Sequence, residues 1–151
     1  MTDTVLVTVK DKTGADVVVK SVPMIGFHPI LKDYMKHHAE LIEAGYSLPV
    51  FIATNKSRAV YAEIDGKVAG YIIFDVREDF IKFAYIVLGY VDPAYRGRSL
   101  YKILHEQLDK VAKSIGCSKV RSEVHPDNTG MLRTLESLGK RVTFYRVEKD
   151  L

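Results

Sequence analysis

Residues 91–100 read VDPAYRGRSL, and this stretch decides the fold. The residues before it, 80–91, are rich in aromatic and β-branched side chains, which favour a strand. The residues after it, 99–115, carry apolar side chains at helical spacing, and Gly116 is a typical helix end. The stretch is therefore predicted to be a short basic turn between a long strand and the best-defined helix of the chain.

The chemistry of this turn favours an anion. The first backbone amides of a helix have no partners within the helix and carry a partial positive charge, so they bind phosphate groups. Gly97 allows the backbone to approach an anion closely, and Arg96 and Arg98 add positive charge. Ser99 can cap the helix or donate its hydroxyl. A pyrophosphate is the natural ligand of such a turn, and a capped connection with two surface arginines is the alternative.

The rest of the chain supplies strands first and alternating strands and helices later. We expect strands over 5–9, 17–22, 60–64, 68–76, 80–91, 119–124 and 142–147, and helices beginning at Pro29, Ser99 and Pro126. The stretch 46–57 is ambiguous, with a short strand over 50–53 as one alternative. This order predicts an α/β (mixed α+β) fold, in which a mixed sheet has helices on both faces.

Composition and charge restrict the class of protein. The 151 residues, 47% hydrophobic and 27% charged, predict a single globular domain over 1–151. No apolar run approaches the ~18 residues of a membrane span, and the N-terminus lacks the features of a signal peptide, so we expect a cytoplasmic protein. The net charge of +3 is too small to predict a nucleic-acid partner. Cys117 alone builds no cysteine metal site, and His37-His38 diverge on a helix, so no metal is expected.

The segment Tyr85–Tyr101 resembles the cofactor motif of the GNAT superfamily of N-acetyltransferases. In that family a strand leads into a loop of the form Gln/Arg-x-x-Gly-x-Gly/Ala, which cradles the pyrophosphate of CoA. Arg96 takes the first position, whereas Ser99 and Tyr101 occupy the two later positions where the family has small residues. Tyr101 has three alternatives: it crowds the phosphate, turns outward along the helix, or stacks on the cofactor. The resemblance covers roughly 58–147 and implies a GNAT-like, largely antiparallel central sheet of six to seven strands.

A second match lies downstream, where residues 124–128 and 135–139 resemble the last strand–helix unit of the family. An asparagine of that unit commonly contacts the pantetheine arm, so the resemblance implies this role for Asn128, with an ordinary helix N-cap as the alternative. In full, the resemblance implies acetyl-CoA as cosubstrate, bound by Gly89, Val91, Arg96, Gly97, Arg98, Ser99, Leu100, Tyr101 and Asn128.

The resemblance also implies how the thioester is activated. A backbone N–H on the strand before the loop stabilises the developing oxyanion, and alignment places it within 89–91, with Val91 as first choice. Gly89 fits a bulge that opens the strand edge for the pantetheine arm.

The acid and base remain less defined by the sequence. Many members of the family carry a base Glu where this chain has Tyr85, whose phenol can orient water. Many also carry a Tyr that protonates the departing thiolate where this chain has Leu135, which cannot donate. Tyr90, Tyr145 or solvent are the alternatives, and His125 acting through water is a further one.

The leading hypothesis is an enzyme that moves an acetyl group from acetyl-CoA to a primary amine by direct attack on the thioester. The acceptor is a small molecule, a peptide N-terminus or a protein lysine. The alternative is a catalytically degenerate module that binds acyl-CoA or a protein partner without turnover. Nucleic-acid binding through the basic stretch 96–121 is a third idea, and the sequence leaves a homodimer open.

Overall fold

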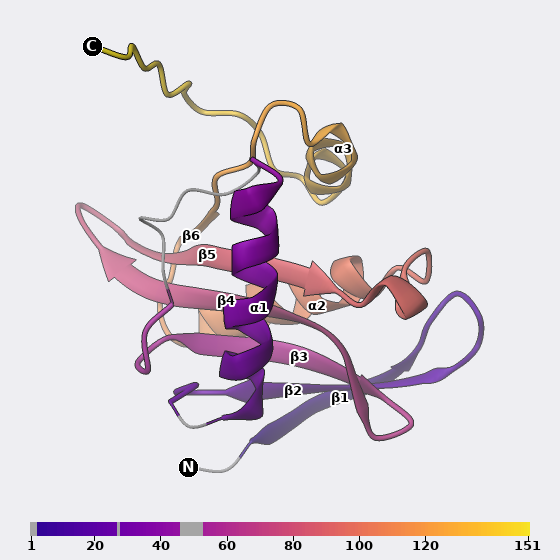
Figure 1. The fold of residues 1–151 in the computed structure, drawn as a ribbon. Helices are drawn as coiled ribbons and strands as arrows, with labels where there is room; N and C mark the ends of the chain where they lie inside the picture. The colour runs from indigo at the N-terminus through magenta and orange to yellow at the C-terminus, as the bar shows by residue number, and fades with distance from the viewer. Residues whose placement is uncertain (1–2, 27, 46–52) are drawn as a thin grey trace.

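The structure is a computed structural model that describes residues 3–26, 28–45 and 53–151. In this part of the chain a six-stranded sheet runs in the order β1 to β6, with α1 in front of it and α2 behind (Figure 1). The strands are β1 (Thr4–Lys10), β2 (Asp16–Val22), β3 (Arg58–Ile64), β4 (Lys67–Glu78), β5 (Lys82–Val91) and β6 (Lys119–Arg121). The helices are α1 (Pro29–Glu43), α2 (Leu100–Ser114) and α3 (Thr129–Ser137), and a 3₁₀ turn, η1 (Pro93–Tyr95), precedes α2.

The sheet is antiparallel except at one edge. Each of β1 to β5 pairs antiparallel with its neighbour, and β6 pairs parallel with β5. A two-residue turn, Asp65-Gly66, joins β3 to β4 with φ values of 51° and 76°, the left-handed conformation that short hairpins favour. The chain passes from β5 to β6 through α2, the kind of crossover that parallel neighbours require. The predicted mixed, largely antiparallel sheet is confirmed.

Each face of the sheet has its own hydrophobic core. Leu100, Leu104 and Leu108 of α2 are buried against one face. Ile30 and Tyr34 of α1 are buried against the other. Burying each such side chain contributes about 1.5–3 kcal/mol. Helices on both faces, as predicted, therefore fix the position of β5 between them.

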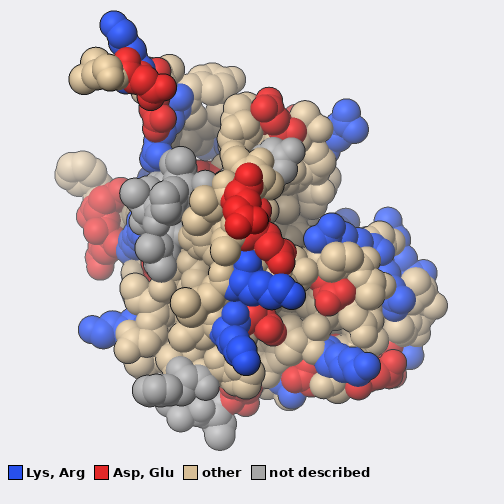
Figure 2. All heavy atoms as spheres, in the orientation of Figure 1, with Lys and Arg blue, Asp and Glu red and all other residues tan. Residues whose placement is uncertain are grey.

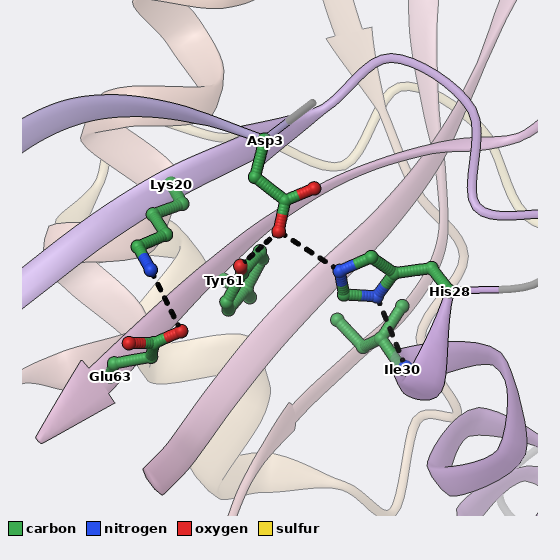
Figure 3. A network of polar contacts seen from close by, with 6 residues as sticks. All are labelled: Asp3, Lys20, His28, Ile30, Tyr61 and Glu63. Atoms are coloured by element: carbon green, nitrogen blue, oxygen red, sulfur yellow. Dashed lines mark hydrogen bonds and ion pairs between the residues drawn. The ribbon is translucent and has the colours of Figure 1, made fainter. Parts of the chain in front are cut away.

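A polar network anchors the start of α1 to the sheet (Figure 3). His28 is the N-cap residue: its Nδ1 accepts a hydrogen bond of 3.2 Å from the amide of Ile30, and Pro29 follows as the first helical residue. Its Nε2 lies 3.0 Å from Asp3 Oδ2, which also accepts a hydrogen bond from the Tyr61 hydroxyl on β3. The network joins Asp3, which precedes β1, to Tyr61 on β3 and to the N-cap of α1.

The prediction of a last strand over 142–147 is wrong for this structure. Residues after α3 form no strand, and Val142, Phe144 and Val147 are 62%, 78% and 90% exposed. The C-terminal segment leads away from the sheet in Figure 1. Alternating apolar residues give strand propensity only, and a strand forms where a partner edge pairs with it. β6 also ends at Arg121, earlier than the predicted 124.

None of the helices in the described part of the chain has the length and apolar character that crossing a bilayer requires. The alternative of a short strand over 50–53 falls mostly outside the described residues, since only Ala53 is described.

Candidate functional site

The turn between β5 and α2 adopts an open, strained path. The Asp92 carboxylate accepts a hydrogen bond of 2.9 Å from the Ala94 amide and so starts η1. Gly97 and Ser99 follow with φ values of 77° and 64°. Such a conformation is uncommon for serine, because its Cβ is crowded there. Ser99 is the N-cap residue of α2, but its side chain makes no cap hydrogen bond. Of the two alternatives for the Ser99 side chain, capping the helix is therefore not observed, whereas donation of its hydroxyl to a ligand stays a prediction.

A run of backbone amides at this turn lacks acceptors within the described residues. The first hydrogen bond of α2 runs from the Ile103 amide to the Ser99 carbonyl, at 3.1 Å. Among the described residues no acceptor is found for the amides of residues 97–102. Gly97 and Ser99 have left-handed backbones directly before the helix start, and left-handed residues are a common part of the backbone concavities that bind anions. A diphosphate at this turn stays a prediction, which these unpaired amides suit.

The two arginines of the turn contact different parts of the chain. Arg96 is exposed, and its Nε donates a hydrogen bond of 3.0 Å to the Val91 carbonyl at the end of β5. Its remaining N–H groups are free to contact an anion at the turn. Arg98 instead lies 3.7 Å from the buried Oδ2 of Asp11, in the turn between β1 and β2. Arg98 therefore links this hairpin to the turn, a contact that the sequence did not predict.

Asp11 organises the turn between β1 and β2, which lies beside the start of α2. Its Oδ1 accepts hydrogen bonds from the Thr13 hydroxyl and amide and from the Ala15 amide. These bonds hold the pKa of Asp11 below its usual value, and the bond from the Thr13 hydroxyl has the largest effect. Burial acts in the opposite direction. A hollow of about 300 Å³ lies between this hairpin and α2, lined by Lys10, Asp11, Lys12, Ser99, Lys102, Ile103 and Glu106. Lys and Arg side chains gather on this side of the molecule (Figure 2).

One edge of β5 is open over its second half. β4 pairs with β5 along its whole length, from Glu78 opposite Lys82 to Gly70 opposite Val91. On the other edge of β5, β6 pairs only with residues 83–85. In the described residues no strand covers the other edge of β5 from residue 86 to 91. Asp92 N donates to Ala69 O on β4. Because N–H directions alternate along a strand, the amides of Gly89 and Val91 face the open edge and that of Tyr90 faces β4.

The bulge in β5 lies two residues before the predicted one. Ile73 pairs with Leu88 and Phe74 with Ile86, so Val87 is the extra residue. The prediction of a bulge at Gly89 is wrong, because this glycine serves another purpose. A Cβ at residue 89 would lie 2.5 Å from Cε2 of Tyr101. The Tyr101 ring therefore lies directly on the β5 backbone rather than turning outward along α2.

The two tyrosines considered for catalysis lie on β5 in different surroundings. Tyr85 is 8% exposed, and burial, aided by the Glu123 carboxylate, raises the pKa of its phenol to about 12. The Arg77 guanidinium lies 4.2 Å from its ring centre. Burial also raises the pKa of Tyr90, which is partly exposed. Both phenols are therefore neutral near pH 7 and can donate or orient water, but neither is a proton acceptor of useful strength.

The downstream residues behave as structural groups. Asn128 is the N-cap of α3, and its side-chain oxygen accepts a hydrogen bond of 3.3 Å from the Met131 amide. Its amide nitrogen remains available for a ligand. Leu135 is buried. Tyr145 is 84% exposed in the C-terminal segment, so it is not brought to the turn.

His37 is a residue near this site that sequence reasoning dismissed. Its Nδ1 lies 2.7 Å from the Tyr71 hydroxyl, and its ring stacks on Tyr90 with centroids 3.4 Å apart. The adjacent His38 points elsewhere, with its Nδ1 2.6 Å from the Tyr34 hydroxyl. The divergence of the pair was predicted, and within the described residues no group of three or more His, Cys, Asp or Glu side chains is arranged to bind a metal. The available signal was helical spacing, since residues 34, 37, 38 and 41 share the face of α1 that meets the sheet.

Comparison with known proteins agrees with this geometry. The family described as "Acetyltransferase (GNAT) family" matches residues 26–139. No curated protein matches the sequence.

Three solved structures illustrate the likeness in fold. An aminoglycoside acetyltransferase from an uncultured soil metagenomic sample superposes with a TM-score of 0.68 at 14% identity, over 89% of this chain and 98% of the other. A ribosomal-protein-alanine N-acetyltransferase from Brucella melitensis biovar Abortus 2308 gives 0.63 at 16% identity, over 89% and 99%. The aminoglycoside N-acetyltransferase AAC(6')-Iy, solved in complex with CoA, gives 0.58 at 18% identity, over 87% and 99%.

Proposed function

Since the chain belongs to the GNAT family of acetyltransferases, we propose that it transfers an acetyl group from acetyl-CoA to the nitrogen of a primary amine. One observation carries the proposal. The amides of residues 97–102, without acceptors in the described part of the chain, lie next to the open edge of β5. A diphosphate and an extended thioester arm of one ligand fit these two features together.

In this proposal the cosubstrate takes its contacts from the turn, from the neighbouring lysines and from the edge of β5. The amides of residues 97–102 and the Arg96 guanidinium bind the diphosphate. The lysines around the neighbouring hollow, Lys10, Lys12 and Lys102, add positive charge beside it. Outward amides and carbonyls of Gly89 and Val91 pair with the amide groups of the arm, as an added strand does. Binding therefore depends on backbone more than on side-chain identity.

The same strand edge activates the carbonyl. Acetyl-CoA supplies a thioester, whose carbonyl oxygen gains negative charge when an amine attacks. An N–H fixed in a strand and aimed at that oxygen stabilises the charge without reorganisation. Only Gly89 and Val91 present such an N–H at the end of β5, because the Tyr90 amide faces β4. Val91 remains our first choice and Gly89 the second.

An amine acceptor is the finer part of the proposal. Two of the proteins similar in fold are N-acetyltransferases, one for aminoglycosides and one for the alanine of a ribosomal protein. This favours nitrogen as the attacking atom. Whether the acceptor is a small molecule, a peptide or a protein is an outcome of the test below. The cytoplasmic location stays a prediction from the sequence.

Two observations favour a second candidate, a module that binds acyl-CoA without turnover. The Tyr101 ring lies on Gly89, within the segment proposed to present the thioester. Leu135, where the resemblance implies a proton donor, is buried and apolar.

A thiol-release screen separates the two candidates. The protein is incubated with acetyl-CoA and a panel of amines, peptides and lysine-containing proteins, and acetylated products are identified by their mass. Cofactor binding is measured in parallel by calorimetry. Binding with an acetylated product supports the enzyme, and binding without thiol release for any acceptor supports the module. No binding of CoA or acetyl-CoA at millimolar concentration would end both.

A further inference from the structure

The C-terminal segment, residues 141–151, carries bulky apolar side chains that lie outside both hydrophobic cores. They are Val142, Phe144, Tyr145, Val147 and Leu151, which are between 62% and 117% exposed. Phe80, at the tip of the β4–β5 hairpin, is 105% exposed, and an ion pair of 3.1 Å between Arg121 Nη1 and Asp79 Oδ2 holds this tip beside β6. Most of the large apolar side chains exposed in the described part of the chain therefore lie in this segment or beside β6. Apolar surface gathered in this way marks an interaction site.

The outer edge of β6 has no strand partner in the described part of the chain. β6 is the last strand of the sheet, and β5 is the one strand that pairs with it there. The backbone N–H and C=O groups of its other edge therefore point away from the sheet. Such an edge is a template on which a further extended segment adds by backbone hydrogen bonds.

The C-terminal segment of the same chain does not cover this edge. At its start Lys140 Nζ donates a hydrogen bond of 2.7 Å to Ser122 Oγ, and farther along Arg146 Nη2 donates one of 3.2 Å to Glu123 Oε1. Both acceptors follow Arg121, the last residue of β6, so the segment passes the end of the strand instead of running along it. It then leads away from the sheet (Figure 1). Each chain therefore presents an uncovered edge and a segment that covers no edge.

We propose that residues 141–147 of one copy dock along the outer edge of β6 of a second copy, which returns the same contact about a two-fold axis. In extended form seven residues span about 23 Å and the six residues 119–124 about 20 Å, so the two lengths match. Val142 and Phe144 would then continue one face of the partner's sheet, and Tyr145 and Val147 the other. The inference is independent of the acetyl transfer proposed above.

The apolar area favours a second copy over an unrelated partner. A buried aromatic side chain covers about 150–250 Å², so the four exposed side chains of one segment remove on the order of 500 Å² from water. The receiving edge, which includes Phe80, loses a similar area. A one-sided contact therefore buries about 1,000 Å², whereas the reciprocal contact buries about 2,000 Å², and stable interfaces need about 1,200–2,000 Å².

The first test is the mass of the protein in solution and its dependence on Phe144. At about 100 μM, where interfaces of this size associate, sedimentation equilibrium should give twice the chain mass of 17.0 kDa. Phe144→Asp should raise the dimer Kd about 30-fold or more, because it places a charge in the apolar contact. Met35→Asp is the matched control, since Met35 is 66% exposed but lies on α1, and it should leave the Kd within about twofold.

The second test identifies the receiving surface with the docking residues unchanged. A nitroxide is attached through Lys149→Cys, in a Cys117→Ala background, to unlabelled protein, which is then mixed with ¹⁵N-labelled wild type. We expect the nitroxide of one copy to broaden the amide signals of residues 119–124 in the other copy. This test also decides the matter if Phe144→Asp does not fold.

Three results overturn the inference. A wild type that stays at 17.0 kDa at about 100 μM makes no such contact. A dimer whose Kd changes less than about threefold in Phe144→Asp does not depend on this segment. Broadening confined to amides outside 119–124 assigns the dimer to another surface. None of these measurements uses CoA, so their failure leaves the proposed function standing, and a failure to bind CoA leaves the dimer standing.

Discussion

Replacing Gly89 with alanine is expected to disrupt the contact between β5 and the start of α2. The new Cβ would lie 2.5 Å from Cε2 of Tyr101, 3.1 Å from its Oη and 3.2 Å from its Cζ. Carbon atoms in contact lie about 3.5–4.0 Å apart, so the ring must move by about 1 Å. Tyr101 follows the fully buried Leu100, which limits how far the backbone can withdraw. We expect Gly89→Ala to lower the free energy of unfolding by about 1–3 kcal/mol, the usual cost of overpacking.

A double-mutant cycle measured by urea unfolding isolates this cause. Tyr101→Ala alone should cost about 2–3 kcal/mol, at or below the usual cost of removing a buried aromatic because the ring is partly exposed. With the ring removed, Gly89→Ala should add almost nothing, which gives a coupling of about 1–3 kcal/mol. Gly130→Ala is the matched control, because a Cβ at this helical position meets nothing within 4 Å; it should stabilise by up to about 1 kcal/mol. A neutral Gly89→Ala, or changes that simply add, would refute the packing argument.

Three other perturbations test separate parts of the account. Arg96→Ala should weaken CoA binding about tenfold in calorimetry, because it removes a charge and the bond to the Val91 carbonyl; an unchanged Kd removes Arg96 from the site. Tyr85→Phe should slow turnover more than it weakens binding if the phenol orients water, and equal kcat eliminates that role. Burial lowers the pKa of Lys140 from 10.5 to about 8. The unfolded chain then binds more protons between these values, so the free energy of unfolding should rise from pH 7 to 10 by on the order of 2 kcal/mol. Lys140→Met should flatten that rise, and an identical pH dependence in both proteins contradicts it.

The elements that local patterns specify were predictable. The strand before residue 92, the turn and α2 are each encoded within a few residues, by β-branched runs, by Pro93 and Gly97 and by helical spacing. Their order fixed a mixed sheet with helices on both faces. The absence of a strand over 142–147 was not predictable, because alternation shows only that a segment can form a strand, while pairing depends on an edge elsewhere in the chain.

The parts of the site that depend on distant residues were missed for the same reason. The partner of Arg98 is Asp11 in the first hairpin, and no local pattern relates them. Residue 89 must be glycine because the Tyr101 ring of α2 lies against it. The sequence does not show this distant contact, so the glycine was interpreted as a bulge. The sequence suggested only a metal-binding role for His37, together with His38, and that role was rejected. Its contacts with Tyr71 and Tyr90 were missed because these residues belong to β4 and β5.

The most direct test of the site is a titration of the ¹⁵N-labelled protein with CoA, followed amide by amide in NMR spectra. We expect the largest shifts at the amides of residues 97–102, with a second group at Gly89 and Val91 and little change at Tyr90, whose N–H faces β4. Shifts confined to other surfaces, or unchanged spectra at millimolar CoA, would contradict a cosubstrate site built from this helix start and this strand edge.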